Sequence, residues 1–369
     1  MTLGINSQST LKQRNGQIEL LRILCAVVIV FNHSELLFPG GNRAVEFFFL
    51  VSGYLMMRSV SRMPSAEKMS LMQLFRDTQT FVFHKIKAFY VELLLALAIG
   101  VVFYALVPHG SCVSYVRNVL KTIFSDALLL KETGIVDLWD VVNGPVWYLS
   151  SMVLGLLFLY PLVRKIGVSL TLFALCSCVL GYCYLTTKVL PNPYALVGFT
   201  LKGNLRAFAE LGLGACAYPL AERLAAVRLK TWVRCLLSAV KWGSLALLCA
   251  LMYRVDSSLD FLFVYLTWGV LIVIFSRQDA DSMLYQGAVF LWLGRFSLPL
   301  YLSHRYYTLH LRGLLPPTTS DAVYLCILFA VSVCTALVVM YGAAYLRRLG
   351  EAGVYKRLLL ADTRQGSER

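Results

Sequence analysis

An arginine and a histidine lie eleven residues apart in the first apolar run of the chain, LRILCAVVIVFNHSELLF at residues 21–38. Ionisable groups in a membrane segment are costly, so they usually have a partner or a function. In an α-helix, Arg22 and His33 fall within about 20° of one face and lie roughly 16 Å apart along the axis. A neutral imidazole there can accept a proton from a hydroxyl group. The alternative is a snorkelling arginine and a histidine hydrogen-bonded between helices.

Polar and aromatic residues also mark the starts of the second and fourth apolar runs. Glu46 lies near the start of AVEFFFLVSGYLMM at residues 44–57, in which Ser52 and a glycine interrupt the apolar residues. Trp147 lies at the start of the run at 146–163. Taken alone, Glu46 is typical of an interfacial cap residue and Trp147 of the aromatic belt at a membrane surface. Both residues are therefore candidates that need support from elsewhere in the chain.

Basic residues gather just before the third apolar run. Arg76 precedes the segment FVFHKIKAFY at residues 81–90, which contains Lys85 and Lys87. Such a patch can bind the phosphate groups of an anionic ligand in the cytoplasm. The alternative is the ordinary excess of Lys and Arg in the cytoplasmic loops of membrane proteins.

Two later apolar runs add further charged candidates. Arg206 precedes Glu210 by four residues, so the two lie on one helical face and are most simply an internal ion pair. Arg295 and His304 lie nine residues apart in LGRFSLPLYLSH at residues 293–304.

The elements that hold these residues are predicted to be membrane helices. Of the 369 residues, 58% are hydrophobic and 15% are charged, and the mean hydropathy is +0.68. These values exclude an ordinary soluble domain. We expect an all-α polytopic membrane protein, embedded in the lipid bilayer, with about ten transmembrane helices in one bundle. The apolar runs lie at about residues 18–38, 44–60, 88–107, 146–163, 169–187, 204–221, 232–253, 259–275, 285–310 and 322–346.

The distribution of charge predicts the orientation. Lys and Arg are more frequent in the segments that share a side with the N-terminus, which predicts that both termini are cytoplasmic. The net charge of +14 has the same origin, so we expect no binding of nucleic acid. The expected organisation is a cytoplasmic tail at 1–17, a transmembrane domain at 18–346 and a cytoplasmic tail at 347–369.

Two smaller features complete the expected organisation. Residues 118–130 alternate apolar and polar residues at helical spacing, which predicts a short helix that does not cross the membrane. The cysteines lie mostly inside apolar runs and have no metal-ligand spacing, so we expect neither a metal site nor a disulfide framework.

Taken together and in this order, these pieces resemble the acyltransferase-3 family of integral membrane acyltransferases, from about residue 15 to 350. The resemblance is carried by four motifs and by the basic segment before the third run. The motifs are Arg22-x10-His33, Glu46-Phe47-Phe48 with Ser52-Gly53-Tyr54, Trp147-Tyr148-Leu149, and Ser297-x3-Tyr301-Leu302-x-His304.

The resemblance implies a protein that moves an acyl group, usually acetyl from acetyl-CoA, onto a hydroxyl of a cell-surface or lipid-linked carbohydrate. A bacterial inner membrane is the location it implies, and protein partners are not indicated. By position, His33 and Arg22 match the family's functional pair, and Lys85 matches a basic residue of the acyl-donor site. We expect His33 to act as a general base, with an acyl-histidine intermediate as the less favoured variant.

The chain departs from the family pattern at two places. The basic segment ends in Ala88 where a cation is usual, so phosphate contact is expected to fall to Lys87 or Arg76. A glutamate that many members carry soon after Trp-x-Leu is replaced here by Ser150-Ser151. Two other classes therefore stay open. One is a transporter or flippase that uses the same intramembrane charges, and the other is a scaffold that has kept the fold without the activity.

Overall fold

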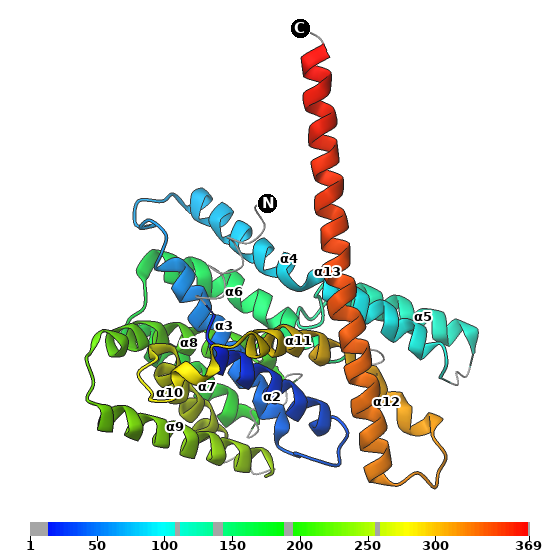
Figure 1. Cartoon of the computed structure of the whole chain (residues 1–369), viewed down its shortest axis with the longest axis horizontal. Helices are drawn as coiled ribbons and strands as arrows, with labels where there is room; N and C mark the ends of the chain where they lie inside the picture. The colour runs from blue at the N-terminus through cyan, green and yellow to red at the C-terminus, as the bar shows by residue number, and fades with distance from the viewer. Residues whose placement is uncertain (1–13, 108–110, 136–142, 188–194, 255–258, 368–369) are drawn as a thin grey trace.

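The computed structural model describes residues 14–107, 111–135, 143–187, 195–254 and 259–367, so most of the predicted N-terminal tail lies outside it. The described chain is mostly helical (Figure 1). Strands β1 (Leu196–Val197) and β2 (Thr200–Leu201) form a short antiparallel pair in which Leu196 faces Leu201. The α-helices are α2 (Gly16–Asn32), α3 (Ala44–Val60), α4 (Leu71–Tyr104), α5 (Cys112–Thr122), α6 (Val146–Ile166), α7 (Leu170–Thr187), α8 (Lys202–Ala226), α9 (Thr231–Met252), α10 (Asp260–Ser276), α11 (Ala288–Ser303), α12 (Arg305–Leu314) and α13 (Asp321–Ser367).

Each of the ten predicted apolar runs contains a helix, but two boundaries differ from the prediction. Helix α4 begins far earlier than residue 88, because Ser70 and Gln73 form a capping box that starts the helix in a polar segment. The single run predicted at 285–310 is two helices, α11 and α12, which meet at His304. The short helix predicted at 118–130 is confirmed as the end of α5 followed by the π-helical turn η2 (Ile123–Ala127).

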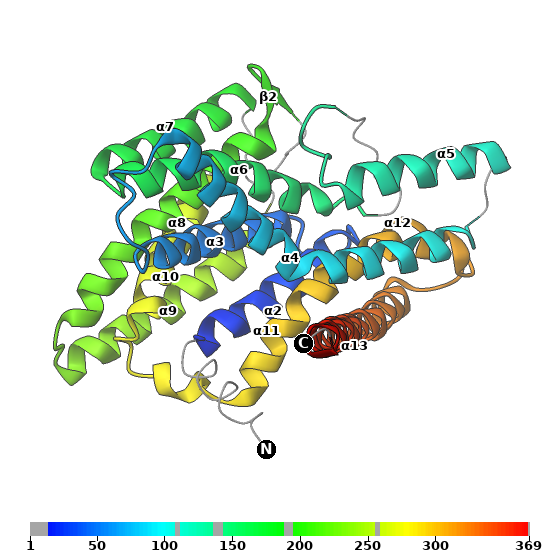
Figure 2. The same cartoon turned by 90° about the horizontal axis from the view of Figure 1, so that it is seen from above.

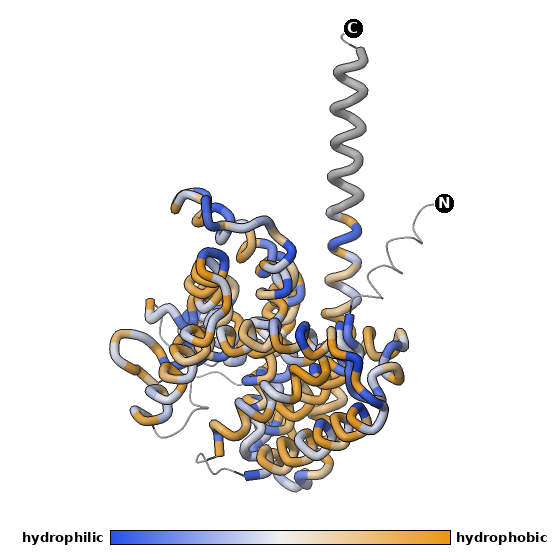
Figure 3. The backbone as a smooth tube through the Cα atoms, turned by 90° about the vertical axis from the view of Figure 1, so that its left-hand side faces the viewer, coloured by the Kyte–Doolittle hydropathy of each residue, from blue (hydrophilic) through white to orange (hydrophobic). Residues whose placement is uncertain are grey.

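The surface of the bundle is that of an integral membrane protein. Within the described residues, four helices are long and apolar enough to cross a membrane, namely α4, α6, α9 and residues 321–350 of α13. Large apolar side chains point outward, for example Phe158 at 71% and Val338 at 62% exposure, and apolar residues colour much of the body in Figure 3. Lipid covers such faces at no cost. The number of ten spans and the cytoplasmic placement of both termini stay predictions.

Helix α8 lies at the centre of the bundle and packs against α3, α6, α7 and α10. Its contact with α3 depends on two glycines that let the backbones touch. A Cβ added to Gly53 would lie 1.9 Å from the Leu211 carbonyl oxygen, and one added to Gly214 would lie 2.0 Å from the Leu50 carbonyl oxygen. In lipid there is no hydrophobic driving force between helices, so their association depends on the close van der Waals packing that small residues permit.

Helices α2 and α11 run side by side in the same direction (Figure 2). Near their first residues Gly294 packs against the Glu19 side chain, and at their last residues His33 meets His304. We call the face of the bundle where these two helices begin the Gly16 face, and the opposite one the His33 face. Helix α13 returns beside α11 and extends out of the bundle beyond the Gly16 face (Figure 1).

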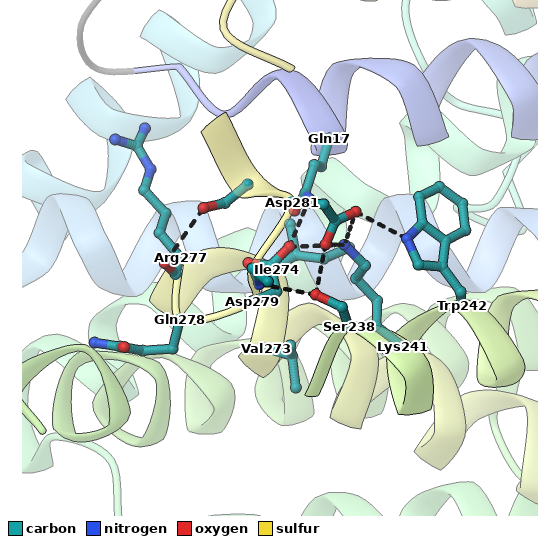
Figure 4. A network of polar contacts seen from close by, with 12 residues as sticks. Gln17, Ser238, Lys241, Trp242, Val273, Ile274, Arg277, Gln278, Asp279 and Asp281 are labelled. Carbon is teal, nitrogen blue, oxygen red and sulfur yellow. Dashed lines mark hydrogen bonds and ion pairs between the residues drawn. The ribbon is translucent and has the colours of Figure 1, made fainter. Parts of the chain in front are cut away.

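A network of ion pairs fixes the beginning of α2 at the Gly16 face (Figure 4). Lys241 of α9 is 1% exposed and binds Asp279 at 2.7 Å and Asp281 at 2.8 Å, both in the connection between α10 and α11. Gln17 donates to Asp279, so the same network reaches α2. Trp242 donates to Asp281. We call these residues the Lys241 network. It holds the start of α2 against α9 and the connection between α10 and α11.

Candidate active site

A cavity of about 690 Å³ lies between α2, α3, α4, α6, α11 and α13. Among the described residues that line it, six are cations and one is an acid, Glu92. The cations are Arg14, Arg22, Lys85, Arg295, Arg347 and Arg348. Arg14 directly precedes α2, and the others come from the parts of α2, α4, α11 and α13 that lie towards the Gly16 face. The cavity is therefore basic at that side.

Only some of these cations have an acidic partner. Arg14 binds Glu19 at 2.8 Å, and Arg22 lies 3.7 Å from the same carboxylate. Arg347 binds Glu92 of α4. Lys85, Arg295 and Arg348 form no ion pair with any residue that the structure describes. Positive charge in excess of its partners favours an anionic ligand.

Hydroxyl groups and aromatic rings line the cavity towards the His33 face. The Ser52 hydroxyl lies 3.4 Å from the Tyr148 hydroxyl. Tyr301 donates to the Pro145 carbonyl oxygen at 2.7 Å. The Phe48 ring packs against both tyrosines, with its centroid 6.0 Å from that of Tyr148 and 6.3 Å from that of Tyr301, and the two tyrosine centroids are 6.0 Å apart. This end has no cation among its described lining residues and suits an uncharged part of a ligand.

The two predicted histidines form a stacked pair just beyond Tyr301. The His33 and His304 rings are parallel to within 18°, with centroids 5.1 Å apart. The Tyr301 ring lies 5.9 Å from that of His304. His304 Nδ1 is 2.7 Å from the Tyr301 carbonyl oxygen, which can only accept, so a neutral His304 carries its proton on Nδ1. His33 itself does not line the cavity, and Tyr301 and His304 connect it to the cavity wall.

The position of His33 follows from local structure. It ends α2 as the C-cap residue, and its backbone N–H donates to the Ile29 carbonyl oxygen at 3.1 Å. Among the described residues, its buried Nδ1 has no hydrogen-bond partner. Within the described part of the chain, Nδ1 of His33 therefore makes no hydrogen bond to another helix, and the ring instead stacks on the imidazole of His304.

The remaining polar candidates form a separate cluster at the start of α3, α6 and α8. Arg206 is fully buried and pairs with Glu46, and its Nε lies 3.7 Å from Glu210, so the predicted ion pair of Arg206 and Glu210 is confirmed. The Arg206 guanidinium also lies over the Trp147 ring at 5.5 Å. Glu46 is 2% and Trp147 is 8% exposed, so the readings as an interfacial cap and a lipid-facing aromatic belt are wrong.

The predicted basic patch is only partly at the cavity. Lys85 lines it, whereas Lys87 and Arg76 are exposed elsewhere on α4 and do not. At Ala88, where the family pattern usually has a cation, Arg347 brings one from α13. Its Nη2 donates to the Ala88 carbonyl oxygen at 3.0 Å. Sequence reasoning missed Arg347 and Arg348 because they lie about 260 residues away. Their position could have indicated a role, because they directly follow the last apolar run, on the same predicted side of the membrane as the start of the first run.

An acid from elsewhere in the chain also lies beside Ser150 and Ser151, which replace the glutamate of the family pattern. Ser150 accepts a hydrogen bond from the Glu132 backbone, and the Glu132 carboxylate lies beside Ser151 and Gly203. Glu132 comes from the connection before α6 and is fully buried. Burial raises the pKa of its carboxyl group from 4.5 to about 8, although Arg206 and Lys131 oppose the shift. An acid therefore lies next to the serines after Trp-x-Leu, without being their neighbour in sequence.

A family model described as an acyltransferase domain, of the acyltransferase-3 type, matches residues 15–341. The matched segment contains all the residues that line the cavity except four, namely Arg14, Ala344, Arg347 and Arg348. No curated protein and no solved structure matches the chain.

Proposed function

The chain belongs to the acyltransferase-3 family of membrane acyltransferases, and from that premise we propose that it transfers an acetyl group from cytoplasmic acetyl-CoA to a carbohydrate hydroxyl. The acceptor in this proposal is a cell-surface or lipid-linked glycan, and the membrane is the bacterial inner membrane. Both termini and the Gly16 face are then cytoplasmic. The family match favours this enzyme over the transporter alternative.

The observation that carries the proposal is the excess of positive charge in the cavity. Lys85, Arg295 and Arg348 have no acidic partner among the described residues, yet they share one cavity with Arg22 and Arg347. Coenzyme A carries several phosphate charges at one end and an uncharged thioester at the other. The cavity has the same polarity, with cations near the Gly16 face and hydroxyls and rings near Tyr148 and Tyr301.

The lengths agree with this orientation. Between Arg22 and His33 the helical rise is roughly 16 Å, and between Arg295 and His304 it is about 13 Å. A pantetheine arm is about 15–20 Å long when extended, by bond counting. If the diphosphate lies near Arg22 and Arg295, the thioester carbonyl reaches the tyrosine end of the cavity, next to the stacked histidines. The acceptor hydroxyl then approaches from the His33 face.

The proposed chemistry needs one proton carrier. The acceptor oxygen attacks the thioester carbonyl carbon, while the His33 imidazole takes the hydroxyl proton. The carbon–sulfur bond then breaks, and the same proton passes from the imidazolium to the thiolate of coenzyme A. No net proton is gained or lost. Because a thioester is an activated acyl donor, transfer to a hydroxyl is energetically downhill, and the protein mainly supplies positioning. Arg22 orients the donor by binding its phosphates, so that the thioester is held at the tyrosine end of the cavity.

Deletion of the gene in its native host, followed by NMR of the surface glycans, tests the proposal. We expect one O-acetyl signal to disappear and to return when the wild-type chain is restored. We expect the His33→Ala chain to insert in the membrane at wild-type level and to restore none of the signal, since removal of a general base costs about 10²–10⁴-fold in rate.

The proposal fails if all O-acetyl signals survive the deletion, or if a well-expressed His33→Ala chain restores them. His310→Ala is the matched control, because this histidine packs on Tyr104 at 5.3 Å, away from the cavity lining. It is expected to restore the signal.

A further inference from the structure

The cavity has a side wall of distinct chemistry where α11 and α13 meet. Trp292 of α11 and Tyr341 of α13 are 40% and 60% exposed, and the indole N–H lies 3.4 Å from the Tyr341 hydroxyl. Phe296 stacks on one face of the indole at 5.4 Å and 5°. The exposed area of Trp292 therefore lies on its other face and its edges. Two rings held in this way form a platform on which a planar ligand group can stack.

Guanidinium groups lie at the same end of the cavity. Arg347 is held in place by Glu92 and the Ala88 carbonyl oxygen. Arg348 follows it on α13, lines the same cavity, is exposed and has no hydrogen bond or ion pair with any described residue. Arginine binds phosphate oxygens through a pair of parallel hydrogen bonds. An aromatic platform beside an uncommitted arginine is suited to a nucleotide that carries a phosphate group.

We propose that this wall binds the nucleotide end of the acyl donor, with the adenine base on Trp292 and Tyr341 and the ribose 3′-phosphate on Arg348. The inference rests on the proposed function and specifies how its donor is recognised.

The order of residues along α11 supports the assignment. Trp292 lies about 4–5 Å closer to the Gly16 face than Arg295, and Tyr301 lies about 9 Å further in than Arg295. A donor with its base at Trp292 therefore has its diphosphate beside Arg295 and Arg22. Its pantetheine arm then points along α11 towards Tyr301 and the histidine pair. The base of the donor thus lies at the aromatic platform, its phosphates at the cations and its thioester at the hydroxyl groups, in the order in which these groups line the cavity.

Equilibrium binding to the detergent-purified full chain tests the inference, with coenzyme A and 3′-dephospho-coenzyme A as the two probes. We expect the wild-type chain to bind coenzyme A about tenfold or more tightly than the dephospho form. Arg348→Ala is expected to remove this difference by weakening only coenzyme A. Trp292→Leu is expected to weaken both probes and to leave 4′-phosphopantetheine unaffected.

Arg62→Ala is the matched control, because Arg62 is an exposed cation that does not line the cavity. The inference is overturned if Arg348→Ala weakens both probes equally or neither, or if Trp292→Leu weakens all three. Failure of the proposed function looks different. In that case the wild-type chain either binds none of the probes, or binds coenzyme A and transfers no acetyl group from its thioester.

Discussion

Two charged regions near the Gly16 face differ in how their charges are paired. In the Lys241 network, one buried ammonium lies 2.7–2.8 Å from two carboxylates, and uncharged donors from α2 and α9 reach the same oxygens. In the cavity, Lys85, Arg295 and Arg348 have no acid among the described residues. Arg295 and Lys241 both lie inside apolar runs, where an ionisable group is by default a candidate for function. The difference in pairing separates a structural cluster from a binding site.

Neutralising Lys241 gives the largest expected effect on stability. Lys241→Met leaves two neighbouring carboxylates without their cation, and removal of one partner of a buried ion pair costs about 3–5 kcal/mol. We expect a lower yield of folded protein and a clearly lower midpoint of thermal unfolding in detergent. The exposed Lys230 is the matched control, and Lys230→Met is expected to leave the midpoint unchanged. Equal midpoints for Lys241→Met and wild type would refute a structural role for the network.

The opposite pattern is expected for the cavity. Replacement of Lys85 and Arg295 by Ala removes charges that form no ion pair with a described residue, so unfolding midpoints stay close to the wild-type value or rise. The KM for acetyl-CoA is expected to increase by about tenfold per charge, since a hydrogen bond to a charged group contributes about 1.5–3 kcal/mol. Initial rates of acetyl transfer at varied donor concentration measure this. A variant that loses stability and keeps its KM would show that these cations are structural.

Acid pH gives the smallest expected effect and again concerns the network. Partial burial disfavours ionisation of Asp281, but hydrogen bonds from Lys241, Ser238 and Trp242 outweigh it and lower the pKa of its carboxyl group below 3.8. The stability that Asp281 contributes is therefore complete above about pH 4 and is lost as the pH falls below that value. We expect Asp281→Asn to flatten the decline of the unfolding midpoint below pH 4.

The matched control for Asp281 is the exposed Asp321, which pairs with Arg312 at the surface. Asp321→Asn is expected to keep the wild-type decline, because exposed ion pairs contribute little. If Asp281→Asn and wild type decline in parallel, the network does not bind Asp281 as an ionised group.

Much of the fold could be predicted from the sequence, because an apolar run and its length can be recognised from residues that are close together in the chain. The helices of all ten runs follow from this, and so does the ion pair of Arg206 and Glu210, which lie on one helical turn. The break at His304 could not be predicted, since the apolar pattern continues through it. It is nevertheless the break that ends α11 with His304 against His33.

The candidate site could be predicted only where its residues lie on elements that the motifs identify. Arg22, Lys85 and Arg295 are of this kind, and all three line the cavity. Arg348 comes from a distant helix, and only the packing of that helix brings it to the cavity. Glu132 comes from a connection, and packing likewise brings it to Ser150 and Ser151, outside the cavity lining. Lys241 shows the converse. It lies inside an apolar run, where function is the default expectation, and the fold pairs it with two aspartates instead.

Binding of coenzyme A to the purified chain as a function of salt concentration tests the central claim most directly, namely that unpaired cations make the cavity a site for the acyl donor. The account predicts saturable binding that weakens steeply with salt. It also predicts wild-type affinity in His33→Ala and strong loss of affinity when Lys85 and Arg295 are both replaced by Ala. Binding that is absent in the wild-type chain, or unchanged in the double variant, would contradict it.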